Sequence, residues 1–182
     1  IESSLIALTG GFLLLLLAGG SEQLVEKAMH AVEWPTIFFF IGLFIAVGGL
    51  IETGIIAELA EHAVAATGGD LTATSMLILW MSAIVSSVLD NIPFVATMIP
   101  LIQGMGAMGI EHLEPLWWSL ALGACLGGNG TLVGASAHLI VAGMASERGV
   151  RISFVRYFKI GFPLMLLTIV LSTVYVYLRY LL

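Results

Sequence analysis

Long apolar segments separated by short polar links make up most of the chain. Residues 35–53 predict a membrane-spanning helix, because about 20 apolar residues are needed to cross a hydrocarbon core of ~30 Å, and residues 5–19 predict a short span. Residues 158–181 predict a final span that ends in tyrosines, which favour the membrane interface. Two further apolar segments, 71–105 and 116–146, are interrupted near their middles by polar residues and glycine. The pattern therefore predicts an all-α integral membrane protein with two unusual segments.

Composition supports this class and excludes several functions. Of the 182 residues, 59% are hydrophobic and 10% are charged, whereas soluble domains carry roughly 25% charged residues. A net charge of −6 with six basic residues excludes nucleic acid as a partner, because so few cations cannot neutralise a run of phosphates. The single cysteine, Cys125, excludes an intramolecular disulfide. No nucleophile–base pair or cluster of metal ligands is recognisable in the sequence, so neither an enzyme nor a cofactor is expected.

The basic residues set the expected orientation. Four of them lie in the link before the final span: Arg148, Arg151, Arg156 and Lys159. The positive-inside rule places this link in the cytoplasm. The charged residues of links 54–73 and 106–115 are all acidic, so both links are expected outside. Segment 116–146 then begins at the outer surface, where Trp117 and Trp118 fit an interfacial belt.

Segment 71–105 must enter and leave on the outer side of the membrane. A re-entrant hairpin that turns near Asp90 satisfies this requirement, and so do two full spans. We favour the hairpin, because Asp-Asn-Ile-Pro is short and closely flanked by apolar residues, which makes a poor cytoplasmic loop.

The first interruption, SSVLDNIP at residues 86–93, places several side-chain oxygens within the apolar segment 71–105. The expected ligands are Ser86, Ser87, Asp90 and Asn91, with Thr97 further along the helix that Pro93 begins. A carboxylate within a span costs at least ~2.5 kcal/mol, so such residues usually serve a function. The alternative is that Asp90 caps a helix in a loop at the membrane surface.

The second interruption, GGNGTLVGAS, predicts a broken helix. Gly128 and Gly130 permit backbone conformations that free carbonyl oxygens for a cation. Three side chains add oxygens: Asn129, Thr131 and Ser136. Gly134 and Ala135 are expected to leave room for an ion or substrate. The alternative is that the glycines only allow close packing of helices.

Oxygen ligands without sulfur suit Na⁺ or H⁺-linked chemistry. The residues expected to hold Na⁺ are Asp90, Asn91, Asn129 and Thr131. His138 follows the second interruption, where a packing role and a proton-carrying role are equally open. Backbone that is not helical at membrane depth must be covered by protein or must line a cavity, and secondary transporters build their binding sites in this way.

These motifs also carry a resemblance to a known family. The stretches SSVLDNIPFVATMIPLI, LWWSLALGACLGGNGTLVGASAHLIVAG and ISFVRYFKIGFP resemble the C-terminal half of the ion transporter superfamily. Within it, the chain is most similar to the ArsB/NhaD-type permeases with a citrate transporter-like domain, a group that includes arsenite permeases, sodium–proton antiporters and the melanosomal P protein. The resemblance runs from Trp34 to the end of the chain. Family members usually have Asn in place of His138.

The resemblance implies two inverted repeats, each with a re-entrant hairpin and a broken helix that share an ion site. It places Ser86, Ser87, Asp90, Asn91 and Thr97 on the hairpin side, and Asn129, Gly130, Thr131 and Ser136 on the broken-helix side. It also implies a homodimer with elevator-type movement. The chain holds one repeat, so residues 1–182 are expected to form a single transmembrane domain, the C-terminal repeat of a longer transporter. The missing N-terminal inverted repeat would be its partner.

The expected function is secondary active transport of a small ion or oxyacid across a bacterial or archaeal inner membrane, coupled to Na⁺ or H⁺. Na⁺/H⁺ antiport and transport of arsenite or another anion both remain open. Neither interruption contains a basic residue, which favours cation exchange or a neutral substrate such as arsenous acid. The alternative is a half-length membrane assembly or scaffold subunit that transports nothing. Besides that small substrate, membrane lipid is the expected partner.

Overall fold

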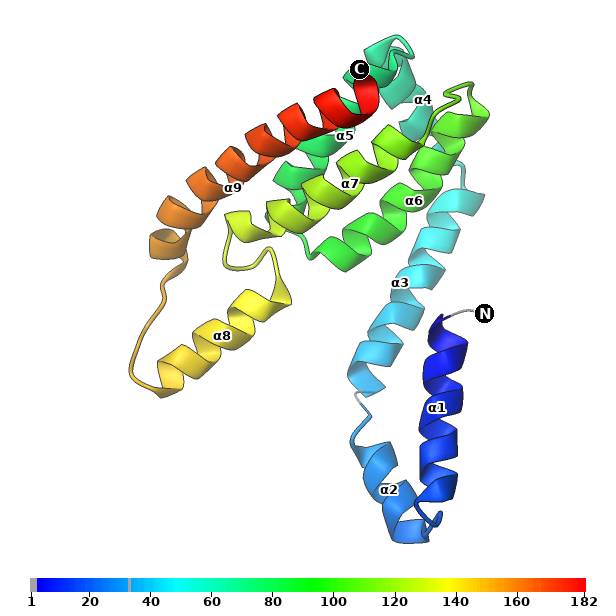
Figure 1. Ribbon diagram of the computed structural model, residues 1–182, viewed down its shortest axis with the longest axis vertical. Helices are drawn as coiled ribbons and strands as arrows, with labels where there is room; N and C mark the ends of the chain where they lie inside the picture. Colours follow the sequence, from blue (N-terminus) through cyan, green and yellow to red (C-terminus); the bar gives the residue numbers. More distant parts are fainter. Residues whose placement is uncertain (1–2, 33) are drawn as a thin grey trace. The chain divides into compact units, whose positions relative to one another are not determined.

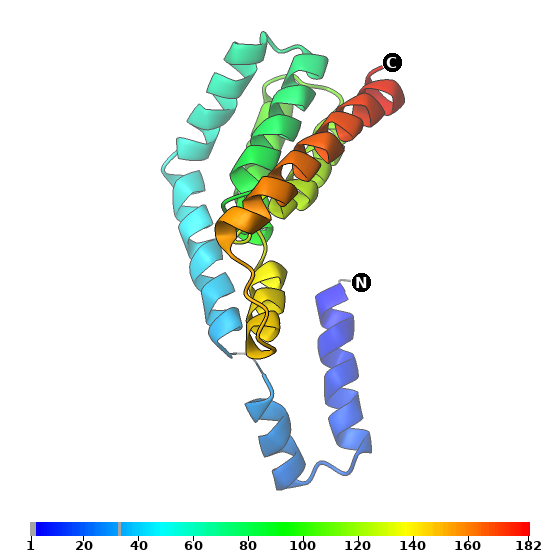
Figure 2. The ribbon, with the colours of Figure 1, turned by 90° about the vertical axis from the view of Figure 1, so that its left-hand side faces the viewer.

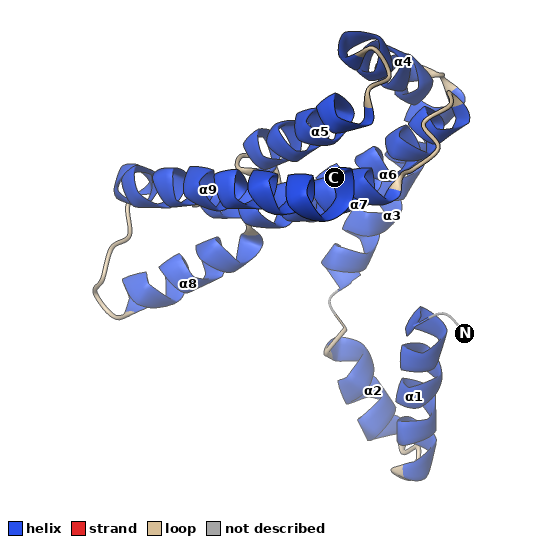
Figure 3. Cartoon of the chain, turned by 45° about the horizontal axis from the view of Figure 1, so that its top comes forward, coloured by secondary structure: helices blue, strands red, loops and turns tan. Residues whose placement is uncertain are grey.

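A computed structural model describes residues 3–32 and 34–182, and the regular elements in these two ranges are all helical (Figure 3). The helices are α1 (Ser3–Leu17), α2 (Glu22–His30), α3 (Trp34–Glu52), α4 (Ile55–Thr67), α5 (Leu71–Ser86), α6 (Asn91–Ala107), α7 (Glu114–Gly127), α8 (Ser136–Glu147) and α9 (Phe154–Val176). A 3₁₀ turn, Gly128–Gly130, follows α7, and a π-helical turn, Tyr177–Leu181, continues α9. The all-α class expected from the sequence is confirmed.

The chain divides into two compact units, Ile1–Leu43 and Phe44–Leu182, with the boundary inside α3. In the first unit, apolar side chains such as Leu14 and Phe38 are mostly exposed. The 19 residues of α3 and the 28 residues from Phe154 to Leu181 are long and apolar enough to cross a membrane. Helix α1, over the short span expected at 5–19, is apolar but has only 15 residues and falls below that length. Exposed leucines and phenylalanines on apolar helices are typical of surfaces that contact lipid.

The second unit is built around α5 and α7, which pack closely together (Figure 1). A methyl group added to Gly123 would strike the carbonyl oxygen of Leu79, and one added to Gly127 would strike that of Ala83. The two glycines therefore let the backbones of α5 and α7 approach within a distance that no larger residue allows.

Two apolar clusters fill the space around this pair. One joins α4, α6 and α7 through residues such as Ala60, Ile102 and Leu120, and the other joins α5 to α9 through Leu79 and Ile169. Helix α8 leaves the bundle (Figures 1 and 2), and none of its residues is buried.

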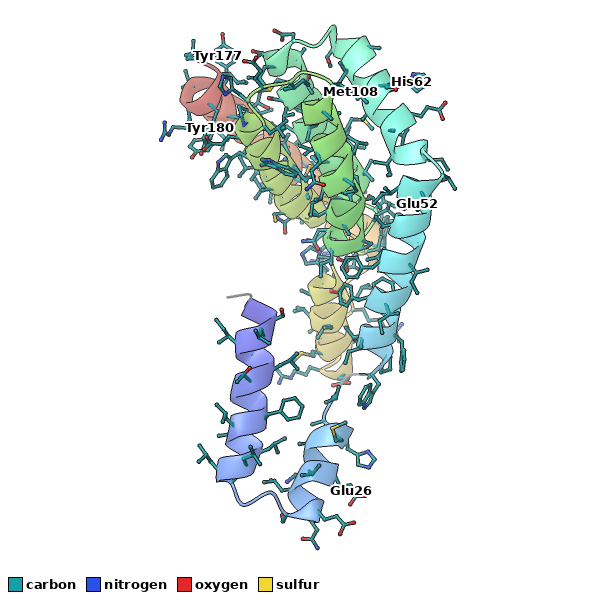
Figure 4. The ribbon with its side chains drawn as sticks, turned by 90° about the vertical axis from the view of Figure 1, so that its right-hand side faces the viewer. Glu26, Glu52, His62, Met108, Tyr177 and Tyr180 are labelled. Carbon is teal, nitrogen blue, oxygen red and sulfur yellow. The ribbon has the colours of Figure 1, made fainter. Side chains whose placement is uncertain are left out.

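The aromatic end of α9 lies beside the start of α7. Trp118 stacks on Tyr180 with ring centroids 5.8 Å apart. Figure 4 shows Tyr177 and Tyr180 at the same end of the second unit as Met108, which follows α6. The aromatic residues expected at the outer interface from two distant parts of the sequence therefore lie together.

Candidate functional site

The helix expected over 116–146 is interrupted where its glycines cluster. Helix α7 ends at Gly127, a single 3₁₀ turn follows, and Thr131 adopts an extended conformation with φ −134° and ψ 165°. Ala135 is also extended, and α8 begins at Ser136. Residues 128–135, here called the break, therefore form the irregular backbone that the sequence predicts.

Thr131 joins the break to the end of α5. Its hydroxyl donates a hydrogen bond to the carbonyl oxygen of Ser87 and accepts bonds from the backbone N–H groups of Val133, at 3.2 Å, and Gly134, at 3.1 Å. One donor and two acceptors are the full capacity of a hydroxyl group. The side chain is buried, at 3% exposure. Thr131 therefore holds the break in place, and its oxygen has no free lone pair for Na⁺ in this arrangement.

Gly134 lies against three backbone carbonyl groups. A methyl group added there would be 2.6 Å from the oxygen of Gly128, 2.7 Å from that of Ser87 and 3.1 Å from that of Ser86. Contacts below 3.0 Å to backbone oxygens do not occur for real Cβ atoms. The expectation that Gly134 leaves room for an ion is wrong, because backbone atoms occupy that space.

The two serines of the first interruption are buried in the same contact. The Ser86 hydroxyl donates to the carbonyl oxygen of Ala124 on α7 at 2.7 Å, and the Ser87 hydroxyl donates to that of Ile84 at 2.6 Å. Gly130 completes the contact, because a methyl group added there would lie 3.0 Å from side-chain carbons of both Ser87 and Met165. The structure therefore brings Ser86, Ser87, Gly128, Gly130 and Thr131 together.

The side of the break that faces away from α5 contacts the first turns of α9. The Tyr157 hydroxyl lies 3.3 Å from the carbonyl oxygen of Asn129 and 3.4 Å from Nε2 of His138. Nδ1 of His138 lies 3.2 Å from the carbonyl oxygen of Thr131. Gly161, one turn after Tyr157, permits this approach, since a methyl group there would be 2.9 Å from the oxygen of Asn129.

The single hydroxyl proton of Tyr157 limits how many of these bonds form together. A neutral ring with its proton on Nδ1 donates to Thr131, and its Nε2 then competes with Asn129 for the single hydroxyl proton of Tyr157. The Tyr157 hydroxyl therefore donates either to Nε2 of His138 or to the carbonyl oxygen of Asn129.

The carboxylate of the first interruption begins α6. Oδ1 of Asp90 accepts a bond from the backbone N–H of Ile92 at 3.3 Å, so Asp90 is the N-cap of this helix. The Thr97 hydroxyl donates to the carbonyl oxygen of Phe94 at 2.7 Å. Asn91 lines a cavity of 470 Å³ together with apolar residues of α6, including Val95 and Ile99. All three polar side chains are partly exposed, so a cap at Asp90 and a ligand at Asp90 are compatible.

The predicted residues thus fall into three groups. The first is the buried contact between α5 and the break, and the second is Asn129 with His138, both of which contact Tyr157. The third is Asp90, Asn91 and Thr97, and the side-chain hydrogen bonds of Asp90 and Thr97 in the described ranges are local to the start of α6. Ser136 is exposed at the start of α8.

Sequence reasoning missed Tyr157 and Gly161. The available signal was their spacing, since residues four apart share one face of a helix. Asn129, Tyr157 and Gly161 also line a cavity of 290 Å³ with Leu164, Met165 and Thr168.

We expect Thr131→Val to destabilise the full-length protein by about 3 kcal/mol, because three buried hydrogen bonds of roughly 1 kcal/mol each are lost. Thr131→Ser keeps the hydroxyl and should cost much less. Unfolding in detergent, followed by circular dichroism, measures both. Equal stability of the two variants would show that the hydrogen bonds of the Thr131 hydroxyl do not stabilise the break.

Comparisons with known proteins give the chain a family. Residues 2–123 match the family model of CitMHS, described as citrate transporter. An uncharacterized transporter of Mycobacterium tuberculosis is 42% identical over 182 residues, which cover 99% of this chain and 42% of the relative. The 46 kDa membrane protein of Mycobacterium leprae is 40% identical over 95% of this chain and 42% of its own length. The human P protein is 39% identical over 93% of this chain and 21% of its own length. No solved structure matches the chain.

These relatives confirm the resemblance that the sequence motifs suggested, including the one to the P protein. The chain spans less than half the length of each of them. The matched family is one of transporters, which confirms that the chain is not an enzyme, and the apolar helices agree with a membrane protein. From the family model and these relatives together, the chain belongs to the CitMHS citrate transporter family.

Proposed function

We propose that the chain forms part of a secondary transporter that moves a small anion such as citrate across a membrane, coupled to Na⁺ or H⁺. The observation that carries this proposal is the break at 128–135, held against the end of α5 by Thr131. Irregular backbone between apolar helices is tolerated where it serves a binding site. The description of the matched family supports citrate as the first substrate to test.

A re-entrant hairpin over 71–105 remains part of this proposal. Helix α5 has 16 residues and α6 has 17, which at 1.5 Å per residue gives about 24–26 Å for each. Both are shorter than the ~30 Å hydrocarbon core. The turn between them lies next to the break, since Ser87 accepts the hydrogen bond of Thr131. These lengths and this contact favour a hairpin whose tip meets the broken helix within the membrane.

We assign the cation to a site between the turn that follows α5 and the break, on the side where Asp90, Asn91 and Asn129 are exposed or partly exposed. Asp90 supplies the charge that the cation neutralises, and Asn91 and Asn129 are neutral ligands. Thr131, expected to bind Na⁺, is assigned instead to hold the break, because its hydroxyl is fully used. Ser136 and His138 lie at the start of α8, where they could contact the substrate.

One repeat supplies half of such a site. The mycobacterial relatives are more than twice as long as this chain, which leaves length in those proteins for a second, inverted repeat. We assign the other half of the site to such a repeat, with the chain as a single transmembrane domain. A homodimer in a bacterial or archaeal inner membrane belongs to the same proposal.

Cation exchange is the second candidate, because the residues at 86–91 and 128–136 include no basic side chain to pair with an anion. Proteoliposomes of the full-length protein separate the two candidates. Citrate uptake driven by an inward Na⁺ or H⁺ gradient supports anion transport. Na⁺-driven proton movement without any citrate, arsenite or other anion uptake would show that cation exchange is the function. Neither flux, in protein shown to be folded, would favour the assembly subunit.

A further inference from the structure

A cavity of about 410 Å³ lies where the link after α8 meets α9. The link contributes Val150, Arg151 and Ile152. Helix α9 contributes one face, formed by Arg156, Tyr157, Ile160, Gly161 and Leu164. Spacings of three and four residues keep these side chains on the same side of the helix.

The two arginines give one end of this cavity an unneutralised positive charge. Both side chains are exposed. Neither guanidinium forms an ion pair with a carboxylate within residues 3–32 or 34–182, where the ion pairs are those of His30 and His62. A guanidinium group offers paired N–H donors whose geometry matches two oxygens of a phosphate. An anionic group is therefore the complementary ligand for this end.

The rest of the cavity is apolar and runs along the helix. Ile160 and Leu164 follow Arg156 by four and eight residues, which places Leu164 about 12 Å further along α9. By the distribution of basic residues, α9 begins at the cytoplasmic surface. The arginines therefore lie at the depth of lipid headgroups, and the aliphatic wall lies at the depth of acyl chains.

We propose that this cavity holds an anionic phospholipid. Its phosphate lies on Arg151 and Arg156, and the first part of an acyl chain packs on Ile160 and Leu164. A free anion would use only the arginines and would leave the aliphatic wall without a partner. Cytoplasmic leaflets supply anionic lipids, and basic side chains near the surface attract them. The bound lipid would support Tyr157, which contacts the break. This binding does not depend on what the protein transports.

Native mass spectrometry of the full-length protein, purified in detergent and titrated with phosphatidylglycerol or phosphatidylcholine, tests the proposal. We expect retained phosphatidylglycerol and little phosphatidylcholine. The double variant Arg151→Gln/Arg156→Gln should weaken phosphatidylglycerol binding about 10- to 30-fold. The matched control, Arg148→Gln/Lys159→Gln, removes the same charge from neighbouring positions that do not line the cavity, and it should bind as the unmodified protein does.

Three results would overturn the proposal. Equal loss in both double variants would mean diffuse attraction to a basic surface. Unchanged binding in both would mean that the lipid lies elsewhere. Displacement of phosphatidylglycerol by glycerol 3-phosphate or citrate at similar concentrations would mean a site for free anions, with no part for the aliphatic wall.

Discussion

Replacement of Asp90 by asparagine should strongly reduce cation-coupled uptake while the protein stays folded. Asparagine caps helices as well as aspartate does, so the bond to the N–H of Ile92 and the start of α6 should survive. What is lost is the negative charge that the cation neutralises. We expect uptake in proteoliposomes to fall at least ~10-fold, about 1.4 kcal/mol in transition-state terms, with the midpoint of thermal unfolding unchanged.

Asp70 provides a matched control for this variant. Its Oδ1 caps α5 by accepting a bond from the N–H of Ala73 at 2.7 Å, so it plays the same structural part as Asp90 at another helix. Asp70→Asn should transport normally. Equal activity of both variants would reduce Asp90 to a helix cap, the alternative that the sequence left open.

Replacement of Gly134 by alanine should disrupt the contact between the break and α5. The added methyl group would lie 2.6–2.7 Å from two backbone oxygens, which cannot rotate away as a side chain could. Overpacking of this kind costs about 1–3 kcal/mol or more. We expect uptake to fall to background and the protein to unfold at a lower temperature, as measured by uptake assays and calorimetry.

Gly143 supplies the control, because it lies in α8 with no heavy atom within 4 Å of an added methyl group. Gly143→Ala should be neutral or slightly stabilising, since alanine favours a helix over glycine by roughly 1 kcal/mol. If Gly134→Ala matched Gly143→Ala in uptake and unfolding temperature, the backbone oxygens of Gly128 and Ser87 could not lie as close to Gly134 as the structure places them.

Local sequence predicts where the helix over 116–146 comes apart. Glycine, asparagine and threonine at 127–131 disfavour a continuous helix through their own backbone and side-chain chemistry, so no distant contact is needed to recognise the interruption. The apolar lengths of α3 and α9 are local signals of the same kind. The helical class followed from them.

The roles of the residues inside the break could not be predicted in this way. Thr131 bonds to Ser87, 44 residues earlier, and Tyr157 contacts the carbonyl group of Asn129, 28 residues earlier. These long-range partners decide which hydroxyl groups form structural hydrogen bonds and which remain available to bind a ligand. For the same reason Gly134, expected to leave space for an ion, instead receives three carbonyl groups.

Protection of the break by substrate tests the central proposal, that residues 128–135 line the binding site. Val133→Cys places a thiol in the break at a position that is 43% exposed, and Val141→Cys places one on α8 at 59% exposure. Both are made with Cys125 replaced by alanine and with no other cysteine in the full-length protein.

Labelling by a membrane-impermeant thiol reagent is then followed with and without citrate and the coupling cation. We predict that citrate and the cation together slow labelling at 133 several-fold and leave labelling at 141 unchanged. Equal labelling rates at 133 with and without them, in protein that transports citrate, would contradict a binding site at the break.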